Sequence, residues 1–419
     1  MPKTCRSVTP AATDAPPPSP ELSLPYPTVS VQSAIVAGRT QEALYERIDL
    51  ELSWSEDELP QLRRTKHVHG LHPYLGKFIP QLVETFLQRY FRRGECIFDP
   101  FVGSGTTLVE ANAFGADSVG VDISAFNCLV CEVKTRPHSL ASLELSLEAA
   151  AAEARGARAS VGAAGSAWLA DWFAPPALAE LLAYRAVAER LPRAFVPVAQ
   201  LVLSRAARSA RMTTHFDLEF PRAPVRSPYF CQKHKRICRP VEEAGKFLHR
   251  YTQDTVQRLR DFSLVRTDRR VSILHADARS VELPVAATGI ITSPPYPGLI
   301  DYHEQHRYAY ELLDLRDLRA CEIGAGARGR GRAALDDYVE AMVQVFRNAA
   351  RQLPRGAPVI VVVHDSRGLY PEILRRSRLV LEDRLTRHVN RRTGRRAGEF
   401  FEDVLVCSTA AGRPLRRGR

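Results

Sequence analysis

The residues with the clearest chemical potential stand where an apolar run ends. The run at 289–292 is followed by Ser293, Pro294, Pro295 and Tyr296. Proline has no amide hydrogen and a fixed backbone angle, so a strand cannot continue through two of them. The chain must leave the sheet rigidly there, which holds a small hydroxyl and an aromatic ring at the sheet edge. Two prolines alone are also what an ordinary strand-to-loop turn contains.

Two other apolar runs, at 96–98 and 119–121, each end in an aspartate, Asp99 and Asp122. A glycine turn and a helical pattern lie between them, which predicts a βαβ unit of a parallel, doubly wound sheet. A later run that ends at Asp277 is expected to join the same sheet. Ligands of such folds bind outside the carboxyl ends of the strands, so these acids and the serine motif should converge. Glycines that admit a ligand, with an acid that accepts ribose hydroxyls, favour a nucleoside.

The glycine turn, GSGTT at 103–107, narrows the class of ligand. It lacks the lysine of a phosphate-binding loop, so a nucleoside triphosphatase is not expected. It also lacks the third glycine of the dinucleotide pattern, which leaves NAD open but not favoured. The turn by itself is weak evidence and gains meaning together with the serine motif.

The two motifs together, FDPFVGSGTTLVEA at 98–111 and TSPPY at 292–296, resemble those of a known family. They are similar to the amino-methyltransferase family of S-adenosylmethionine-dependent DNA methyltransferases, in particular its N4-cytosine group. The resemblance covers roughly residues 66–135 and 270–408. It implies a Rossmann-like methyltransferase sheet, mostly parallel with an antiparallel closing strand, which carries a large, mainly helical insertion.

The resemblance also implies S-adenosylmethionine as the cofactor. HPYLGKFIP at 72–80 loosely resembles the family's N-terminal cofactor motif. Asp122 is expected to take the ribose hydroxyls and Asp277 to contact the adenine amine. The full set of cofactor-binding residues implied in this way is Lys77, Phe78, Asp99, Phe101, Gly103, Gly105, Thr106, Asp122 and Asp277.

The serine motif is expected to be catalytic, through Ser293, Pro294, Pro295 and Tyr296. An exocyclic amine of cytosine is a poor nucleophile because its lone pair is delocalised into the ring. Acceptors at the Ser293 hydroxyl and the Pro294 carbonyl would hold the two N–H bonds while Tyr296 stacks on the base, which is catalysis by positioning with direct in-line transfer. The base must be flipped out of the duplex, at a cost of a few kcal/mol. No metal is expected in this reaction.

Several other activities remain open at this stage. Adenine N6 methylation uses a related motif that usually starts with Asp or Asn, so Ser293 favours cytosine. Methylation at C5 needs a cysteine that its family carries in a Pro-Cys pair, and the chain contains no such pair. An RNA amino-methyltransferase, as in N2-guanine enzymes with a similar Pro-Pro-Tyr motif, is an alternative. A non-catalytic nucleic-acid-binding protein on the same fold is another.

The charge of the chain favours a polyanionic partner. The formal net charge is +11, and the excess is clustered. Basic residues gather at 201–240, at 384–396 and in a glycine-spaced stretch at 327–332. One cluster alone is usually a solvated surface, but three together favour nucleic acid. Double-stranded DNA is the expected partner, and a cognate restriction endonuclease is a further one.

The chain shows no sign of membrane insertion or export. It contains no apolar run of 18 or more residues, and its first twenty residues lack the apolar region of a signal peptide. We therefore expect no membrane contact and a cytoplasmic, bacterial-type protein associated with the nucleoid. Reduced thiols are expected in that compartment.

The cysteines offer one alternative to this metal-free picture. Cys128 with Cys131, and Cys231 with His234 and Cys238, are residue types that bind zinc. The spacing of the second set is irregular for a zinc finger, and the two sets lie far apart in the sequence. Buried free cysteines are therefore favoured over structural zinc.

The elements that must position these residues form two halves with an insertion between them. We predict a disordered, proline-rich tail at 1–40 and a basic tail at 411–419. The methyltransferase domain is predicted at 41–135, with the cofactor motif, and at 266–410, with the catalytic motif. The region 136–265 is predicted to be helical and basic, and it is far longer than a crossover helix needs. The resemblance makes it a candidate for target recognition.

Periodicity predicts the individual elements within these regions. Apolar residues at helical spacing predict helices, and near-continuous apolar runs bounded by turns predict buried strands. The expected helices are one starting at Pro80, 107–114, one from about Ser139, one from Pro176, one near 241–261, and 335–352. A parallel-type strand is predicted at 357–365, and a closing antiparallel pair at 379–389 and 400–409.

Overall fold

The computed structural model describes residues 50–410, apart from 56, 74–77, 156, 158–165, 216, 218–220, 299–300, 330 and 390–399. The tails predicted at 1–40 and 411–419 lie outside the described residues, as does Lys77. Much of the predicted basic cluster at 384–396 lies outside them too. The described residues belong to one compact unit, Ile48–Arg419.

A seven-stranded sheet in the order β5-β2-β1-β6-β7-β9-β8 forms the centre of this unit. The strands are β1 (Cys96–Asp99), β2 (Asp117–Asp122), β5 (Val271–His275), β6 (Gly289–Thr292), β7 (Pro358–Val363), β8 (Leu379–His388) and β9 (Phe401–Thr409). The first five in the spatial order are parallel, and β9 pairs antiparallel with both β7 and β8. The predicted doubly wound sheet with an antiparallel closing pair is confirmed.

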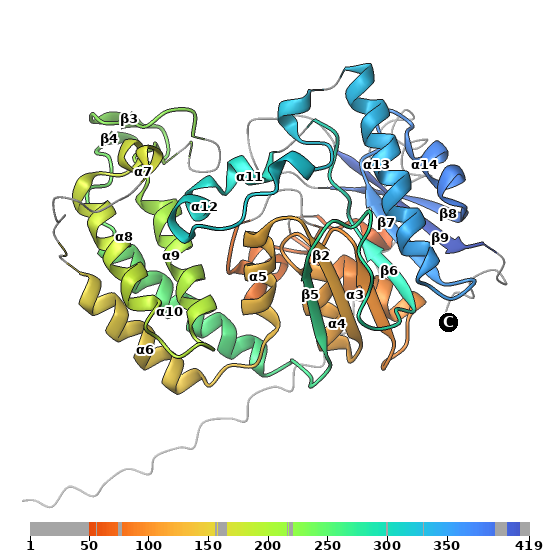
Figure 1. Ribbon diagram of the computed structural model, residues 1–419, viewed down its shortest axis with the longest axis horizontal. Helices are drawn as coiled ribbons and strands as arrows, with labels where there is room; N and C mark the ends of the chain where they lie inside the picture. Colours follow the sequence, from red (N-terminus) through yellow and green to blue (C-terminus); the bar gives the residue numbers. More distant parts are fainter. Residues whose placement is uncertain are drawn as a thin grey trace, which may run out of the picture. The chain divides into compact units, whose positions relative to one another are not determined.

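Strand β7 shows why both faces of the sheet must be covered. Val359 and Val361 pack in a cluster with helices α13 (Arg332–Arg351) and α14 (Tyr370–Ser377). Ile360 and Val362 pack in another cluster with α3 (Pro80–Tyr90) on the opposite face. A continuous run of β-branched residues is buried on both sides, as in parallel sheets generally. Figure 1 shows the sheet between these helices.

The helices that flank the cofactor motif follow its local sequence. Pro80 stands in the first turn of α3, where its missing N–H costs nothing. Gly105 precedes α4 (Thr106–Phe114), and Gly115 ends it with a left-handed backbone. Ser124 caps α5 (Ala125–Thr135) by accepting the Asn127 N–H. The expected helices at Pro80 and 107–114 are confirmed, while α5 is an addition that the sequence did not predict.

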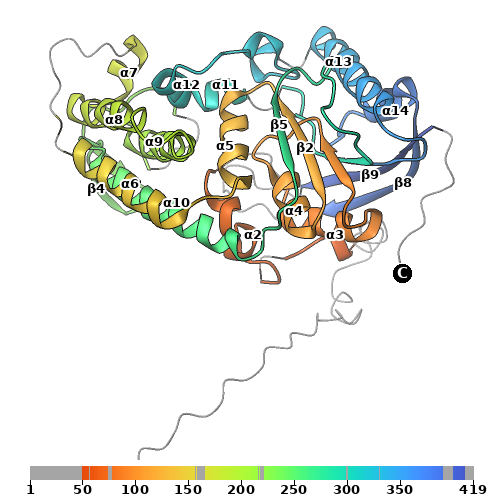
Figure 2. The same ribbon diagram turned by 60° about the horizontal axis from the view of Figure 1, so that its bottom comes forward.

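The region 136–265 is mainly helical, as predicted. Its elements are α6 (Leu140–Ala154), α7 (Ala167–Trp172), α8 (Pro175–Ala188), α9 (Val196–Ala210), β3 (Tyr229–Cys231), β4 (Arg236–Cys238) and α10 (Gly245–Ser263). Figures 1 and 2 show these helices as a layer beside the sheet, with α6 and α10 running together. The β3–β4 hairpin, an antiparallel pair at the edge of this layer away from the sheet, was not predicted.

This helical layer shares one apolar core with elements of the sheet domain. Two helices follow β6 in the sequence, α11 (Tyr302–Gln305) and α12 (Arg307–Leu313). Tyr308 and Leu312 of α12 and Phe126 of α5 are buried in the same cluster as Leu147 and Leu203 of the insertion. The insertion is therefore packed against both halves of the sheet domain.

Burial corrects the picture of the basic cluster at 201–240. Arg205 is 6% exposed, donates from Nη1 to Thr255 Oγ1 at 2.6 Å and forms an ion pair with Asp254. Arg211 is 4% exposed and stacks its guanidinium over the Tyr308 ring, 4.7 Å from the centroid. Arg205 joins two helices of the layer and Arg211 joins the layer to α12, so the basic surface of this region is smaller than its composition implies.

Short helical turns complete the described structure: η2 (Leu50–Leu52), α2 (Gln61–Arg64), η3 (His67–Gly70), η4 (Arg319–Cys321) and η5 (Gly326–Arg328). Among the residues described, none of the helices combines the length and the apolar character needed to cross a membrane.

Candidate active site

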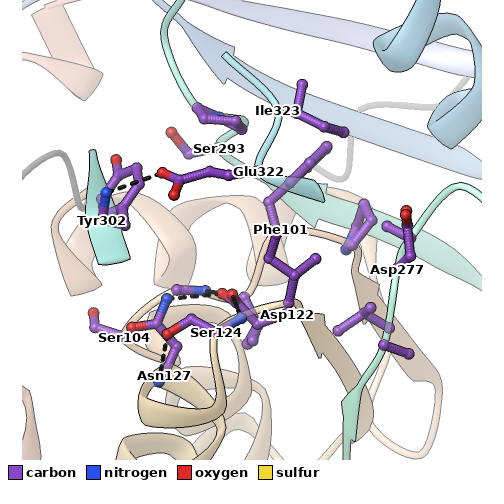
Figure 3. A pocket seen from close by; sticks show the side chains of 18 of the residues that line it. Phe101, Ser104, Asp122, Ser124, Asn127, Asp277, Ser293, Tyr302, Glu322 and Ile323 are labelled. Carbon is purple, nitrogen blue, oxygen red and sulfur yellow. Dashed lines mark hydrogen bonds between the residues drawn. The ribbon is translucent and has the colours of Figure 1, made fainter. Parts of the chain in front are cut away.

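A pocket opens at the carboxyl ends of β1, β2, β5 and β6, where the predicted site residues should meet. Its volume is about 840 Å³ when its open mouth is included. The predicted residues that line it are Phe78, Phe101, Gly103, Thr106, Asp122, Asp277, Ser293 and Pro295. Figure 3 shows Asp122 and Ser293 on opposite sides of Phe101. The cofactor motif and the serine motif therefore share one cavity.

Asp122, at the end of β2, is a pocket carboxylate that accepts three hydrogen bonds. Its Oδ1 accepts the Ser124 N–H at 2.8 Å, and its Oδ2 accepts the Gly103 N–H at 2.9 Å and the Asn127 side-chain amide at 3.0 Å. Burial raises the pKa of Asp122, and these N–H donors oppose that shift. The carboxylate thus links the glycine turn to the start of α5.

Asp99 lies beneath the pocket rather than on its wall, and its side chain is 1% exposed. Its Oδ1 accepts the Phe101 N–H at 3.1 Å and the Thr292 hydroxyl at 2.6 Å. One carboxylate therefore holds the cofactor loop and the strand that leads into the serine motif. Burial raises the pKa of Asp99 to about 6. Its role in the structure is to shape the pocket.

Gly105 also supports the pocket without lining it. Its φ is +80°, a conformation that favours glycine. A Cβ at this position would lie 2.8 Å from the Cys131 sulfur. The turn can approach α5 this closely because residue 105 has no side chain.

Two hydroxyls on the pocket wall fit a polar ligand such as the nucleoside expected here. Ser104 Oγ and Thr106 Oγ1 are buried, and neither has a hydrogen-bond partner among the described residues. Both residues line the pocket. Because buried polar atoms are nearly always paired, hydroxyls of this kind are suited to bind a group that enters the cavity.

Asp277 lines the pocket just after β5 and is paired with Arg279. The Arg279 Nε lies 3.0 Å from each carboxylate oxygen. Burial opposes ionisation, but the hydrogen bonds and charge of Arg279 outweigh it and lower the pKa of Asp277. Phe78 is buried on the same pocket wall, and Lys77 lies outside the described residues.

The serine motif enters the pocket through only part of its length. Ser293 and Pro295 line it, whereas Pro294 and Tyr296 do not. The Tyr296 hydroxyl donates to Glu402 Oε1 on β9 at 3.0 Å. Burial and the Glu402 carboxylate raise the pKa of Tyr296 well above its usual value, so the ring stays a neutral phenol. Tyr338 donates to the Pro295 carbonyl at 3.0 Å, which fixes the motif further.

Three pocket residues come from segments to which the sequence assigned no site. Glu322 accepts the Tyr302 N–H at 2.9 Å and contacts His303 Nδ1 at 2.8 Å, and all three residues line the cavity. The polar aromatic stretch at 301–310 offered a weak signal for the tyrosine and the histidine. Glu322 had none, because only folding places it next to residues about twenty positions earlier. Ser124 and Asn127 could have been found from the helix cap after Asp122.

A family model described as DNA methylase, of the N6/N4 type, matches residues 38–132. The type II methyltransferase M.MjaII of Methanocaldococcus jannaschii is 35% identical to the chain, over 86% of the chain and 84% of the relative. M.MvaI of Kocuria varians, also a type II methyltransferase, is 38% identical over 16% of each protein.

Among solved structures, the rRNA methyltransferase aviRa of Streptomyces viridochromogenes covers 80% of this chain and 88% of its own. Its identity is 13% and its TM-score is 0.32. At this distance the match indicates nothing about a substrate.

Proposed function

The chain belongs to the N6/N4 family of DNA methyltransferases, and from this premise we propose that it methylates the N4 amine of cytosine in double-stranded DNA. S-adenosylmethionine is the cofactor, and when bound it supplies an electrophilic methyl group carried on a sulfonium. The observation that carries the proposal is that Ser293, the first residue of the motif, lines the same pocket as Asp122.

Under this proposal, the pocket residues that bind the cofactor are distinct from those that hold the base. Asp122 accepts the ribose hydroxyls, and Asp277 receives the adenine amine beside Phe101. The unpaired hydroxyls of Ser104 and Thr106 face the polar end of the cofactor. Charge-assisted hydrogen bonds of the Asp122 kind are worth about 1.5–3 kcal/mol each.

The chemistry at the base depends on Ser293 and Pro294. The serine hydroxyl and the proline carbonyl accept the two N–H bonds of the cytosine amine and favour a tetrahedral nitrogen with an available lone pair. Rigid attachment of these acceptors lowers the entropic cost of reaching that geometry. Asp99 and Tyr338 support this, because they hold Thr292 and Pro295, the residues on either side of the two acceptors. Tyr296, anchored by Glu402, stacks on the flipped base.

The choice of cytosine over adenine rests on Ser293. Related motifs for adenine usually begin with Asp or Asn, which can accept more strongly than a serine hydroxyl. Adenine N6 is therefore the second candidate at the same site. Recognition of the target sequence is assigned to the region 136–265, whose exposed basic residues suit phosphate contacts. A cognate restriction endonuclease is the partner proposed for a type II enzyme.

The direct test is to identify the methylated nucleoside. The purified chain is incubated with labelled S-adenosylmethionine and plasmid DNA, the DNA is digested, and the labelled nucleoside is identified by mass spectrometry. N4-methylcytosine is the expected product. Ser293→Ala should form much less N4-methylcytosine. Ser55→Ala, at an exposed serine that is distant from Ser293 in the sequence, serves as the matched control.

Other products would overturn parts of the proposal in distinct ways. N6-methyladenine would keep the pocket and its cofactor but reject the role given to the serine. Label in RNA and none in DNA would favour an RNA amino-methyltransferase over a DNA methyltransferase. Failure to bind S-adenosylmethionine would favour a non-catalytic nucleic-acid-binding protein.

A further inference from the structure

Four metal-binding side chains gather at the β3–β4 hairpin, and none of them lines the methylation pocket. We define the hairpin cluster as His215, Cys231, His234 and Cys238, whose ligand atoms all lie within 4.8 Å of one another. His215 comes from the segment after α9, and the other three come from the hairpin. The sequence pattern had brought together only these last three, and Cys128 with Cys131 takes no part in the cluster.

The distances within the hairpin cluster match a tetrahedral metal site. The Cys231 sulfur lies 3.6 Å from His215 Nδ1 and 3.7 Å from His234 Nδ1, and the Cys238 sulfur lies 3.6 Å from His234 Nδ1. Zinc–sulfur bonds of about 2.3 Å and zinc–nitrogen bonds of about 2.0 Å, at a tetrahedral angle, separate sulfur and nitrogen by about 3.5 Å. The spacing leaves room for an ion at the centre.

The donor set selects the class of metal. Two thiols and two imidazoles suit zinc, whereas magnesium and calcium require oxygen ligands, and the hairpin cluster contains no carboxylate. Cys231 and Cys238 are free thiols in the structure, and both are buried, at 2% and 7% exposed. We propose that the hairpin cluster binds Zn²⁺ as a Cys₂His₂ structural site, with loss of the two thiol protons on binding.

The backbone between Cys231 and His234 is folded for such a site. The Lys235 N–H donates to the Cys231 carbonyl at 2.8 Å and closes a tight turn. Lys235 has a φ of +52°, which is uncommon for a residue other than glycine, asparagine or aspartate.

The hairpin has little else to stabilise it. Its strands have three residues each, and a two-stranded hairpin is marginal in water. Phe230 and Ile237 face each other across the strands but are 55% and 64% exposed, so they form no core. A metal ion supplies the missing stabilisation and joins the hairpin to the segment that follows α9. It would thereby position the exposed basic residues Lys233 and Arg236.

One contact competes with the metal at His215. The Tyr229 hydroxyl lies 2.8 Å from His215 Nδ1 and also accepts the His215 backbone N–H at 3.1 Å. Metal binding requires the hydroxyl to release Nδ1 while it keeps the backbone bond. Tyr229→Phe should therefore retain zinc. This result would distinguish Tyr229, a neighbour of the metal, from Cys231, the ligand in the same strand.

The test measures metal rather than methylation, so it is independent of the proposed function. The full chain, purified without added chelator, should contain about one zinc per chain by plasma mass spectrometry. Replacement by Co²⁺ should produce the visible bands of a tetrahedral site and sulfur-to-cobalt charge transfer. Cys231→Ser and Cys238→Ser should retain less than a tenth of the zinc, while Cys321→Ser, at a cysteine outside the cluster, should retain all of it.

Several outcomes would reject the site. These are a wild-type chain that neither contains zinc nor develops the cobalt spectrum, full zinc in both cysteine variants, and a disulfide between Cys231 and Cys238 in the chain purified under reducing conditions. If the cysteine variants fail to fold, X-ray absorption of the wild-type chain decides, because two sulfur and two nitrogen neighbours are expected around zinc. A different stoichiometric metal in the cluster would reject zinc.

Discussion

At the scale of single residues, the aspartates around the pocket have different roles because their surroundings differ. Asp122 and Asp277 face the pocket, whereas Asp99 is enclosed beneath it and bonded to Thr292. An aspartate at the carboxyl end of a strand can therefore be either a binding group or a positioning group. Separate substitutions should separate these roles.

Asp122→Ala should weaken cofactor binding before it affects anything else. Loss of a carboxylate acceptor for hydroxyls costs about 1.5–3 kcal/mol, so affinity for S-adenosylmethionine should fall by about 10- to 100-fold. Isothermal titration calorimetry measures it directly. Asp117→Ala, at the opposite end of the same strand, is the matched control. An unchanged affinity in the first variant would remove Asp122 from the site.

Ser293→Ala should lower the rate of methyl transfer with little change in cofactor binding. Removal of one positioned hydrogen-bonding group at a reacting centre is expected to cost about 10- to 100-fold in kcat. Single-turnover transfer to DNA and cofactor titration of the same preparation provide the two readouts. If both decline in parallel, the serine supports the fold of the pocket and does not contact the base.

The buried Asp99 should make stability depend on pH. Its pKa is raised to about 6 in the folded chain from an ordinary value of 3.8, so the folded state holds the proton more tightly. This contribution is present below pH 4 and is lost as the pH rises through 6, by up to about 3 kcal/mol. The difference in unfolding free energy between the wild type and Asp99→Asn should decline from pH 4 to 7 in urea titrations. A difference that stays constant over this range would contradict the shift.

At the scale of elements, the glycine turn between β1 and α4 requires a glycine for two reasons, its backbone conformation and its close packing. Gly105→Ala should destabilise the chain by about 1–3 kcal/mol, because it combines a left-handed backbone with a contact to Cys131. Cys131→Ala in the same chain should relieve the contact but not the backbone strain. Gly331→Ala should change the stability little, because a Cβ added at residue 331 would meet nothing within 4 Å. Chemical denaturation compares the four proteins, and equal stability of the two glycine variants would reject this account.

Most elements could be predicted because their causes are local. The apolar runs of β1, β2 and β7 and the proline at the start of α3 produce the same structure wherever they lie in a doubly wound sheet. The helix α12 and the β3–β4 hairpin could not be predicted in this way. The buried face of α12 is recognisable only against the insertion helices, and the strands of the hairpin are too short to show a period.

At the scale of the whole molecule, the net charge of +11 is distributed unevenly once burial is known. Arg205 and Arg211 are internal, and the exposed basic residues of the insertion concentrate on and near the hairpin. This places the proposed phosphate contacts on one part of the insertion. The proposed zinc site holds that part in position.

The salt dependence of DNA binding tests this placement. Each phosphate contact contributes about −0.9 to the slope of log K against log salt concentration. Lys233→Ala combined with Arg236→Ala should reduce the magnitude of the slope by about 2, measured by fluorescence anisotropy on duplex DNA. Arg92→Ala with Arg93→Ala, an exposed pair just before β1, should leave it unchanged. Equal slopes in the two double variants would exclude the hairpin from the interface.

The amino-acid sequence is sufficient to predict the doubly wound sheet, the family and the meeting of the glycine turn with the serine motif. These depend on apolar runs, turn residues and the rule that parallel strands end at one edge. Tertiary structure alone reveals that Glu322 meets His303, that Arg205 and Arg211 are buried, and that His215 completes the hairpin cluster. Each of these depends on contacts between side chains from separate segments, and only packing of the whole chain brings such partners together.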